Sequence, residues 1–182
     1  MNTVIITGTS TGIGNAIAKN LLKQNVTVIG ISRKHTIKHK NYFAISFDLN
    51  DSKNIKNILD DIIFNHKKID AIISSAGYGV FENLENLKEK EVIDFFNVNL
   101  LAHILISKSL VSHFKKKKTG HFIFIGSEAS LKGNQKSTLY SAAKHGLLGF
   151  VKSFREECNK SEIRVTIINP GMVKTNFFNN LD

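Results

Sequence analysis

Short apolar runs rich in β-branched residues alternate along this chain with stretches whose apolar positions recur every three or four residues. The first pattern is typical of strands buried on both faces of a sheet, and the second of amphipathic helices. We therefore predict strands at residues 3–7, 26–31, 42–47, 69–74, 121–125 and 163–168. Helices are predicted at 12–24, about 52–63, 88–114 and 137–157, the third as two consecutive helices that meet near Asn97–Asn99.

The alternation of strands and helices predicts an α/β domain. Strands joined by helices of this length form right-handed βαβ crossovers, which build a parallel sheet with helices on both faces. The sequence shows no internal repeat and no linker rich in proline, glycine or serine. We therefore expect residues 1–182 to form a single domain with a doubly wound parallel sheet (a Rossmann fold) of about six strands.

Composition narrows the classes of function. The chain has 182 residues, of which 42% are apolar, as in a globular domain, and its single cysteine, Cys158, cannot form an internal disulfide. No apolar run reaches the length of a membrane span, and the N-terminus lacks the pattern of a secretion signal. We therefore expect a cytoplasmic protein that does not bind membranes.

The formal net charge of +10 suggests a nucleic-acid partner, but the kind of basic residue argues against one. Only Arg33, Arg155 and Arg164 are arginines, which readers of bases and phosphates favour, whereas the lysines are spread along the chain. The densest run, Lys115–Lys118, suits the negative end of a helix with Gly120 just beyond its stop. We expect no nucleic-acid partner, and the minor alternative of a nucleic-acid-associated protein predicts steeply salt-dependent binding.

A glycine-rich turn follows the first predicted strand and precedes the first helix. Gly8 permits a tight turn, Gly12 lets the backbone approach a pyrophosphate, and Gly14 allows the helix to pack closely on the strand. The helix N-terminus adds free N–H groups and a positive dipole end, and nearby hydroxyls add donors. The sequence therefore predicts a dinucleotide site formed by Gly8, Ser10, Thr11, Gly12, Ile13 and Gly14.

The residues after the second strand bear on the choice of dinucleotide. An acidic residue there would hold the ribose 2′-hydroxyl of NAD and repel a 2′-phosphate. Ser32 and Arg33 instead offer a hydroxyl and a guanidinium to a dianion. This favours NADP(H), with NAD(H) as the alternative, although a solvent-facing turn would also account for the two residues.

Tyr140 and Lys144 are four residues apart, on one face of the last predicted helix. A nearby ammonium stabilises a phenolate and lowers the pKa of the tyrosine, so that it can exchange a proton with a carbonyl or alcohol oxygen. Ser127 ends the fifth strand, and active groups of open α/β sheets gather at the carboxyl ends of strands. Glu128 and Ser130 are polar alternatives nearby.

Read as Thr-Gly-xxx-Gly-x-Gly, the turn from Thr7 to Gly14 resembles that of the short-chain dehydrogenase/reductase family, and the likeness runs from Thr3 to about Thr175. It implies that Asn99 interrupts a helix and holds a water in a proton relay. It also implies that Ser127 positions the substrate oxygen and that Tyr140 is the acid/base. Lys144 would tune Tyr140 and hold the nicotinamide ribose. The implied catalytic set is Asn99, Ser127, Tyr140 and Lys144.

The resemblance implies further cofactor contacts. Asp48, with Leu49, would meet the adenine edge, although Asp48 also suits the N-terminus of a helix. In Ser74-Ser75-Ala76-Gly77 the family usually has asparagine where Ser75 stands, which puts the tightness of cofactor binding in doubt. The implied cofactor contacts beyond the turn after the first strand and the residues after the second are Asp48, Leu49, Ala76, Gly77, Asn99, Tyr140, Lys144, Pro170, Gly171, Val173 and Thr175.

The family resemblance implies an NADP(H)-dependent oxidoreductase that interconverts a small-molecule carbonyl and an alcohol, without a metal, as a homodimer or homotetramer. A non-catalytic NADP-binding regulatory or scaffold protein of the same fold is the alternative. Family members continue past the Pro170-Gly171 turn with a substrate lid and a seventh strand, which we expect to be missing here. The chain would then be a truncated form, or a short variant with an open or partner-completed site.

Overall fold

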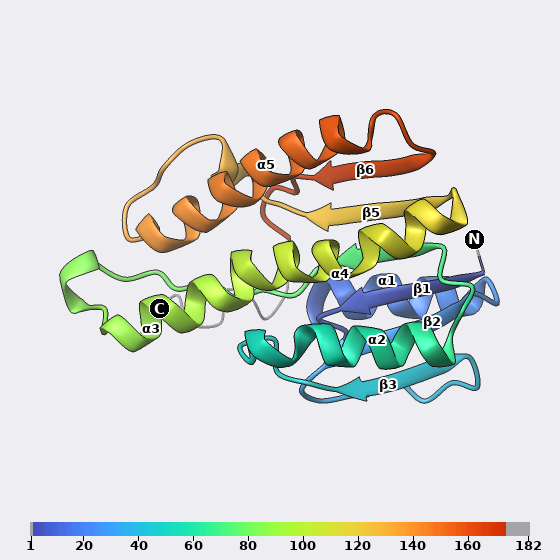
Figure 1. The fold of residues 1–182 in the computed structure, drawn as a ribbon. Coiled ribbons are helices and arrows are strands. Elements are labelled where there is room, and N and C mark those ends of the chain that lie inside the picture. The colour runs from blue at the N-terminus through green and yellow to red at the C-terminus, as the bar shows by residue number, and fades with distance from the viewer. Residues whose placement is uncertain (1, 174–182) are drawn as a thin grey trace.

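The computed structural model describes residues 2–173. Its strands form one parallel sheet in the order β3-β2-β1-β4-β5-β6, and all the arrowheads point the same way (Figure 1). The predicted strands and the doubly wound topology are confirmed, with boundaries that shift by at most two residues. The strands are β1 (Thr3–Thr7), β2 (Thr27–Ser32), β3 (Tyr42–Ser46), β4 (Ala71–Ser74), β5 (Gly120–Ile125) and β6 (Ile163–Ile168).

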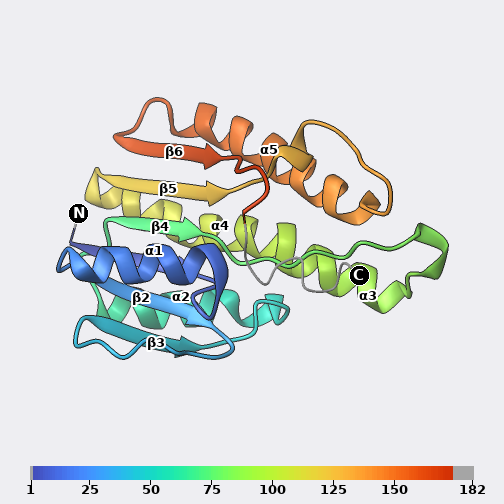
Figure 2. The ribbon, with the colours of Figure 1, turned by 180° about the vertical axis from the view of Figure 1, so that it is seen from behind.

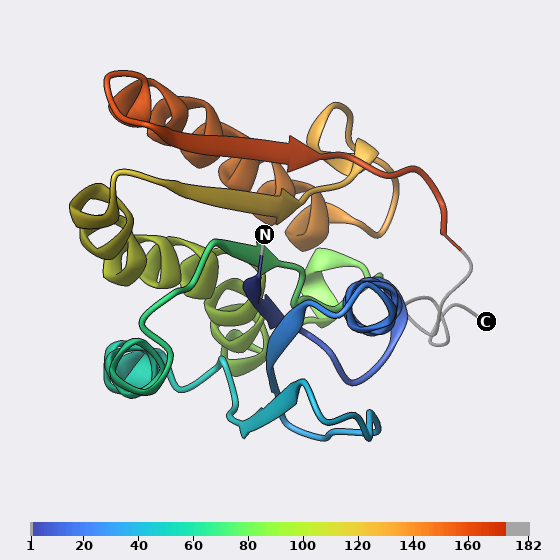
Figure 3. The same cartoon turned by 90° about the vertical axis from the view of Figure 1, so that its right-hand side faces the viewer.

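The helices lie on both faces of this sheet. The α-helices are α1 (Gly12–Lys23), α2 (Ile55–Asn65), α3 (Glu89–Phe96), α4 (Ala102–Lys117) and α5 (Thr138–Cys158). Helix α1 lies alone against one face, over β1 and β2 (Figure 2), whereas α2, α4 and α5 cover the other (Figure 3). Within residues 2–173, no helix covers β5 and β6 on the α1 face, and Ile168 is 50% exposed there.

Alternation along each strand divides the core between the two faces. Val4 and Ile6 of β1 pack with Ala18 and Leu22 of α1, whereas Ile5 packs in the larger cluster beneath α2, α4 and α5. All three β1 side chains are fully buried, because the sheet is covered on both faces at this strand. This double burial explains why the sequence of β1 reads as a continuous apolar run.

The helix break predicted near Asn97–Asn99 is confirmed as a π-helical turn, η3 (Asn97–Leu101), between α3 and α4. The continuous helix Glu89–Lys117 is long and apolar enough, by length and composition, to cross a membrane. The sequence analysis missed this because it sought an uninterrupted apolar run. Ile106, Leu110 and Phe114 pack in the core of the sheet, and a buried core helix passes the same test.

The end of α4 differs from the expected one in a single detail. Lys115, Lys116 and Lys117 do occupy the last turn, where cations stabilise the helix dipole. The residue that leaves the helix with a positive φ is Lys118 (φ 54°), and not Gly120. Gly120 belongs to β5, and a Cβ there would lie 2.3 Å from the ring of Phe114. This glycine therefore makes room for an aromatic side chain.

The strand order indicates at which edge of the sheet a ligand would bind. Since β1 pairs with β2 on one side and with β4 on the other, the order reverses between β1 and β4. Ligands of open α/β sheets bind at this point, outside the carboxyl ends of the strands. The loops after β1, β4, β5 and β6 all leave from that end, and α3 extends beyond it (Figure 1).

Candidate active site

The loop between β1 and α1 is shaped by its glycines. Gly8 (φ 75°) and Gly12 (φ 60°) adopt the left-handed conformation that disfavours other residues. A Cβ on Gly14 would lie 2.4 Å from the carbonyl oxygen of Gly8, so only glycine lets α1 begin this close to the strand. Within the described residues, Thr11 makes no side-chain capping bond to α1 and the first turn holds no acidic residue, so the helix N-terminus suits an anion.

Ser10 and Ile13 complete this loop and are both partly exposed. Their placement beside the glycines is compatible with the phosphate role predicted for them. The carbonyl groups of Thr9 and Ser10 accept from the Asn15 side chain, at 2.7 Å and 3.4 Å. Asn15 therefore fixes the course of the loop from the first turn of α1.

The loop after β4 packs directly on the loop after β1. The Thr7 hydroxyl accepts from the backbone N–H groups of Ser75 and Ala76, each at 3.0 Å. A Cβ on Gly8 would lie 2.9 Å from the Cα of Ala76. Thr7 thus joins two segments that a dinucleotide would span. We missed this role, although the threonine that opens the glycine motif was its signal.

Arg33 and Ser32 differ sharply in exposure. Arg33 is exposed, as a group that meets a phosphate must be. Ser32 is buried, and its hydroxyl donates to the carbonyl of Lys34 at 2.7 Å. In this structure the one proton of the Ser32 hydroxyl is thus given to a backbone carbonyl, and its contact with a 2′-phosphate stays a prediction.

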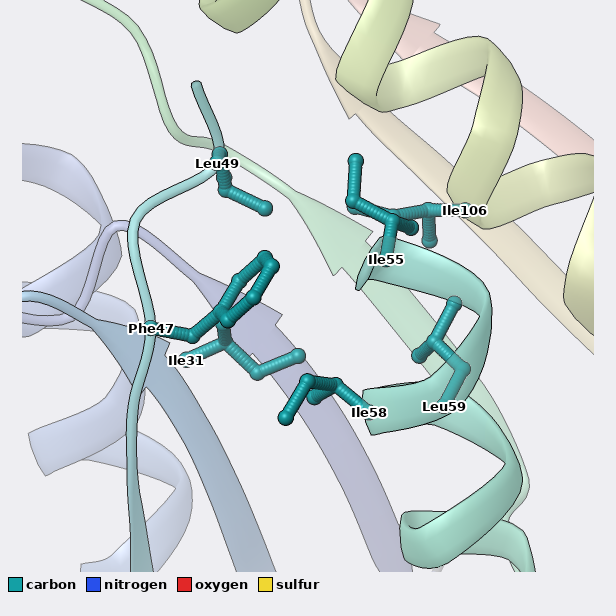
Figure 4. A pocket seen from close by; sticks show the side chains of 7 residues that line it. All are labelled: Ile31, Phe47, Leu49, Ile55, Ile58, Leu59 and Ile106. Atoms are coloured by element: carbon teal, nitrogen blue, oxygen red, sulfur yellow. The ribbon is translucent and has the colours of Figure 1, made fainter. Parts of the chain in front are cut away.

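Asp48 and Leu49 follow β3 as expected. The Asp48 carboxylate accepts from the backbone N–H of Asn50 at 3.0 Å, which forms a turn ahead of the next helical segment, Ser52–Asn54. Asp48 is therefore not the cap of a helix, and its exposed side chain leaves the adenine role as the prediction. Leu49 lines a small apolar pocket between α2, α4 and the sheet (Figure 4). That pocket is lined by Ile31, Phe47, Leu49, Ile55, Ile58, Leu59 and Ile106, and so it carries no polar chemistry.

Asn99 is fully buried inside the π-helical turn. Its side-chain amide donates to the carbonyl of Phe95, and its side-chain oxygen accepts from the backbone N–H of Tyr78, each at 3.1 Å. A Cβ on Gly77 would lie 2.8 Å from that oxygen, so glycine is required where the loop after β4 crosses Asn99. The π-turn aims Asn99 at this loop, as such turns often do at functional sites.

Ser127 and Tyr140 are brought together from β5 and α5. Ser127 follows the end of β5, and its hydroxyl oxygen accepts from the backbone N–H of Ala129 at 3.1 Å. Its side chain also lies close enough to the Tyr140 hydroxyl to lower the pKa of Tyr140. The Tyr140 ring is 8% exposed and lies 5.7 Å from that of Phe81, within a third apolar cluster around Phe95. The pair can hold one substrate oxygen between two hydroxyls.

Lys144 lies one helical turn after Tyr140 and is 5% exposed. Its ammonium donates to the carbonyl of Ile125, at the end of β5, at 3.0 Å, and lies over the Tyr140 ring at 5.7 Å from the centroid. Burial lowers the pKa of Lys144 to about 8. The ammonium thus contacts the ring face and a strand end.

The expected effect of Lys144 on Tyr140 is not what the structure shows. Burial raises the pKa of Tyr140 above its ordinary value of 10.0, and the nearby Ser127 side chain opposes this only in part. Desolvation of the phenolate is the largest influence on this pKa. A closer charge or donor is needed before Tyr140 ionises readily.

The buried amine predicts how stability depends on pH. The pKa of Lys144 is lower in the folded chain, about 8, than its ordinary 10.5, so between these values the unfolded chain binds more protons. The free energy of unfolding should therefore rise with pH across that window, by roughly 3 kcal/mol from this group. Urea denaturation of the wild type and of Lys144→Met would measure it. Equal pH slopes for the two proteins would contradict the prediction.

The segment after β6 lies beside Ser127. The backbone N–H of Gly126 donates to Ile168 at 2.7 Å, and that of Glu128 donates to Pro170 at 3.2 Å. Gly171 is close enough to Glu128 that a Cβ would lie 3.2 Å from its carboxylate. Pro170 and Gly171 thus reach the catalytic set, and Val173 is 39% exposed just beyond them. Thr175 lies outside the described residues.

A buried histidine beneath the site was missed by the sequence analysis. His103 of α4 is 1% exposed, and its Nδ1 lies 2.6 Å from the hydroxyl of Ser74, at the end of β4. Burial, followed by the charge of Lys144, lowers the pKa of His103 to about 3, so the ring is neutral. It ties β4 to α4 behind the residues predicted to be catalytic. Its position one turn after Asn99 was the signal available.

The whole chain is similar to known oxidoreductases. Residues 2–182 match the family model described as short chain dehydrogenase. The 3-oxoacyl-(acyl-carrier-protein) reductase FabG of Buchnera aphidicola subsp. Acyrthosiphon pisum is 39% identical over 188 residues, which cover 99% of this chain and 77% of the relative.

Solved structures show the same likeness. ElxO with NADP bound superposes with a TM-score of 0.89 at 25% identity, covering 98% of this chain and 77% of ElxO. 4-Hydroxyisoleucine dehydrogenase complexed with NADH gives a TM-score of 0.87 at 27% identity, covering 96% of this chain and 77% of that one. The family match over nearly the whole chain, on the fold described above, shows that this protein belongs to the short-chain dehydrogenase family of oxidoreductases.

Proposed function

We propose that this chain transfers hydride between NADP(H) and a carbonyl/alcohol pair, with Tyr140 as the general acid/base. The observation that carries the proposal is the proximity of Tyr140, Ser127 and the Lys144 ammonium, which lies 5.7 Å from the centroid of the Tyr140 ring, at the carboxyl edge of the sheet. Lys144 lies one helical turn from Tyr140, and the glycine-rich loop after β1 leaves from the same edge. This arrangement supports proton transfer next to a bound dinucleotide.

The residues fit such a cofactor. A Cβ on Gly14 would collide with the loop backbone, and the unblocked N-terminus of α1 is suited to a pyrophosphate. Exposed Arg33 is suited to a 2′-phosphate, which favours NADP(H) over NAD(H). ElxO was solved with NADP and 4-hydroxyisoleucine dehydrogenase with NADH, so proteins of this fold take either.

The chain's own residues would divide the chemistry as follows. A bound nicotinamide supplies or accepts the hydride. In reduction, Tyr140 gives its phenolic proton to the substrate oxygen while the carbonyl carbon gains the hydride, and the product is an alcohol. Ser127 donates to the same oxygen and stabilises its developing negative charge. Lys144 holds positive charge beside the phenolate, and Asn99 keeps the loop after β4 in place.

The substrate class is also a proposal. The relative at 39% identity is named a 3-oxoacyl-(acyl-carrier-protein) reductase, which makes a 3-oxoacyl thioester the first substrate to test. The apolar cluster of Val80, Phe81 and Phe96 around Tyr140 suits an aliphatic chain better than a sugar. The same chemistry would also act on simple ketones and aldehydes.

The test of this function is direct. NADPH oxidation is followed by its ultraviolet absorbance with a 3-oxoacyl thioester and a panel of aldehydes and ketones. Turnover of any of them with NADPH supports the proposal. Tight NADPH binding without turnover of any substrate would overturn it in favour of a non-catalytic NADP-binding protein.

Cofactor preference gives a separate prediction. In Arg33→Gln the guanidinium that would hold the 2′-phosphate is lost, so the Kd for NADPH should rise about tenfold while that for NADH stays unchanged. Fluorescence titration of the reduced cofactors measures both. Arg164→Gln is the matched control, because Arg164 is exposed near the start of β6, at the opposite edge of the sheet. Equal losses for both cofactors in Arg33→Gln would contradict the prediction.

We also propose that α4 and α5 pair across subunits in a cytoplasmic homodimer or homotetramer. Leu101 is 36% exposed, and Gly149 of α5 has open space, as far as residues 2–173 show, where a Cβ would be. This helical face can therefore accept another helix closely. Light scattering coupled to size-exclusion chromatography would determine the assembly. A monomer at micromolar concentration would overturn this part of the proposal.

A further inference from the structure

A chain of buried and partly buried hydrogen bonds runs from the loop after β1 to the segment after β2. The Thr9 hydroxyl lies 3.2 Å from that of Ser32 and 2.8 Å from that of Tyr42. The Tyr42 hydroxyl lies 2.7 Å from Nδ1 of His35, and Ser32 donates to the carbonyl of Lys34 at 2.7 Å. Four side chains from three strands and their loops thus meet between the phosphate loop and Arg33.

The direction of these bonds follows from counting protons. Ser32 gives its one proton to the Lys34 carbonyl, so it accepts from Thr9. Thr9 then accepts from Tyr42, and Tyr42 accepts from the N–H at Nδ1 of His35. Nε2 of His35 is buried with no partner within the described part of the chain, which also places the proton on Nδ1. Every hydroxyl of this network is thereby both a donor and an acceptor.

Gly30 leaves the space that the Tyr42 side chain occupies. Gly30 of β2 is paired with Ala44 of β3, and a Cβ on Gly30 would lie 2.2 Å from the Tyr42 hydroxyl oxygen. The phenol therefore crosses over Gly30 on the α1 face and reaches Thr9 and His35. No other residue at position 30 would leave this path open.

A second link joins the same two segments. The Asn15 amide donates to the carbonyl of Thr9 at 2.7 Å and to the hydroxyl of Thr36 at 3.4 Å. Residues 32–36 are therefore held from two sides against the phosphate loop. Arg33 lies within this held segment, and its own side chain is exposed. The position of its guanidinium thus depends on how well residues 32–36 are fixed.

We propose that Tyr42 and His35 are positioning residues for cofactor choice: they hold the segment that carries Arg33 at the distance from the phosphate loop that suits a 2′-phosphate. Neither residue touches the cofactor. The inference rests on the proposed NADP(H) function, but it concerns preference between cofactors and not turnover. A fixed position of residues 32–36 matters most for a ligand that contacts both these residues and the phosphate loop. NADPH would do so through its extra phosphate.

The test measures the Kd values of NADPH and NADH for the full chain with Tyr42→Phe, which keeps the ring and deletes the hydroxyl. The ratio of the NADH Kd to the NADPH Kd should fall by about threefold to tenfold, the size expected for one lost hydrogen bond. Thr166→Val is the matched control, because it deletes a hydroxyl that lies 2.8 Å from His121, between β5 and β6, and should leave the ratio unchanged.

A second pair of variants distinguishes an effect on cofactor preference from a general loss of structure. His35→Ala should lower the ratio as Tyr42→Phe does, whereas His35→Asn, which keeps a donor near Nδ1, should restore much of it. If the wild type shows no preference for NADPH, both the proposed cofactor and this inference are overturned. If it prefers NADPH and the ratio is the same in Tyr42→Phe, or if both Kd values rise equally, only this inference is overturned.

Discussion

Replacing Tyr140 by phenylalanine should lower kcat by about a thousandfold, because the group placed to exchange a proton with the substrate oxygen is removed. The ring, which packs against Phe81 and the cluster around Phe95, remains. Ser127 remains as a donor to the oxygen, so residual turnover above the uncatalysed rate is expected. The measurement is steady-state NADPH oxidation at saturating substrate.

The binding readout separates chemistry from folding in this variant. The Kd for NADPH should rise by at most about tenfold, since the phenol hydroxyl contributes one hydrogen bond at most. The melting temperature should also stay near that of the wild type, because burial and ring contacts are kept. A kcat within tenfold of the wild type, in a variant that binds NADPH normally, would remove Tyr140 from the mechanism.

Gly14→Ala should be the most damaging substitution in the phosphate loop. The added Cβ would lie 2.4 Å from the carbonyl oxygen of Gly8 and 3.0 Å from that of Thr7. Both are backbone atoms, so α1 must move away from β1. We expect a loss of about 2 kcal/mol in the free energy of unfolding and at least a tenfold rise in the NADPH Kd. Chemical denaturation and cofactor titration measure the two effects.

Gly133→Ala is the matched control for that experiment. Gly133 is exposed in the loop before α5, and no atom of the described residues stands within 4 Å of the site of its Cβ. Alanine should therefore stabilise the chain by about 0.5 kcal/mol, the opposite sign to Gly14→Ala, because it restricts the unfolded chain. If the two substitutions have similar effects on stability and on cofactor binding, close packing is not the reason for glycine at position 14.

The sequence was most informative where one residue type meets one physical requirement. Short apolar runs rich in β-branched residues form strands here, and Thr3–Thr7 and Ile163–Ile168 were predicted to the residue. The break at Asn97–Asn99 was visible as paired asparagines in a helical pattern, and the structure adds that the turn is π-helical. Tyr140, Ser127 and Lys144 were predicted from their order along the chain and do come together.

The sequence was least informative about contacts between segments far apart in it. The Thr7 hydroxyl reaches Ser75 and Ala76 only because β1 and β4 are neighbours in the sheet. The pKa of Tyr140 was expected to fall, but the depth of its burial, which no spacing reveals, raises it. The buried hydroxyl of Ser32 is a similar case, because the Thr9–Tyr42 network around it is set by the pairing of strands.

The π-helical turn also constrains how this chain can vary. It holds one extra residue compared with a regular helix, so deleting a single residue between Asn97 and Leu101 would leave an unbroken α-helix. The deletion would not be silent, because it would remove the wider turn that holds the Asn99 side chain against the backbone N–H of Tyr78. The directions of α3 and α4 would stay nearly the same, because the wider turn absorbs the extra residue. A one-residue gap at this point in the sequence of a homologue would therefore mark a protein that keeps its core but loses the link between this helix and the loop after β4.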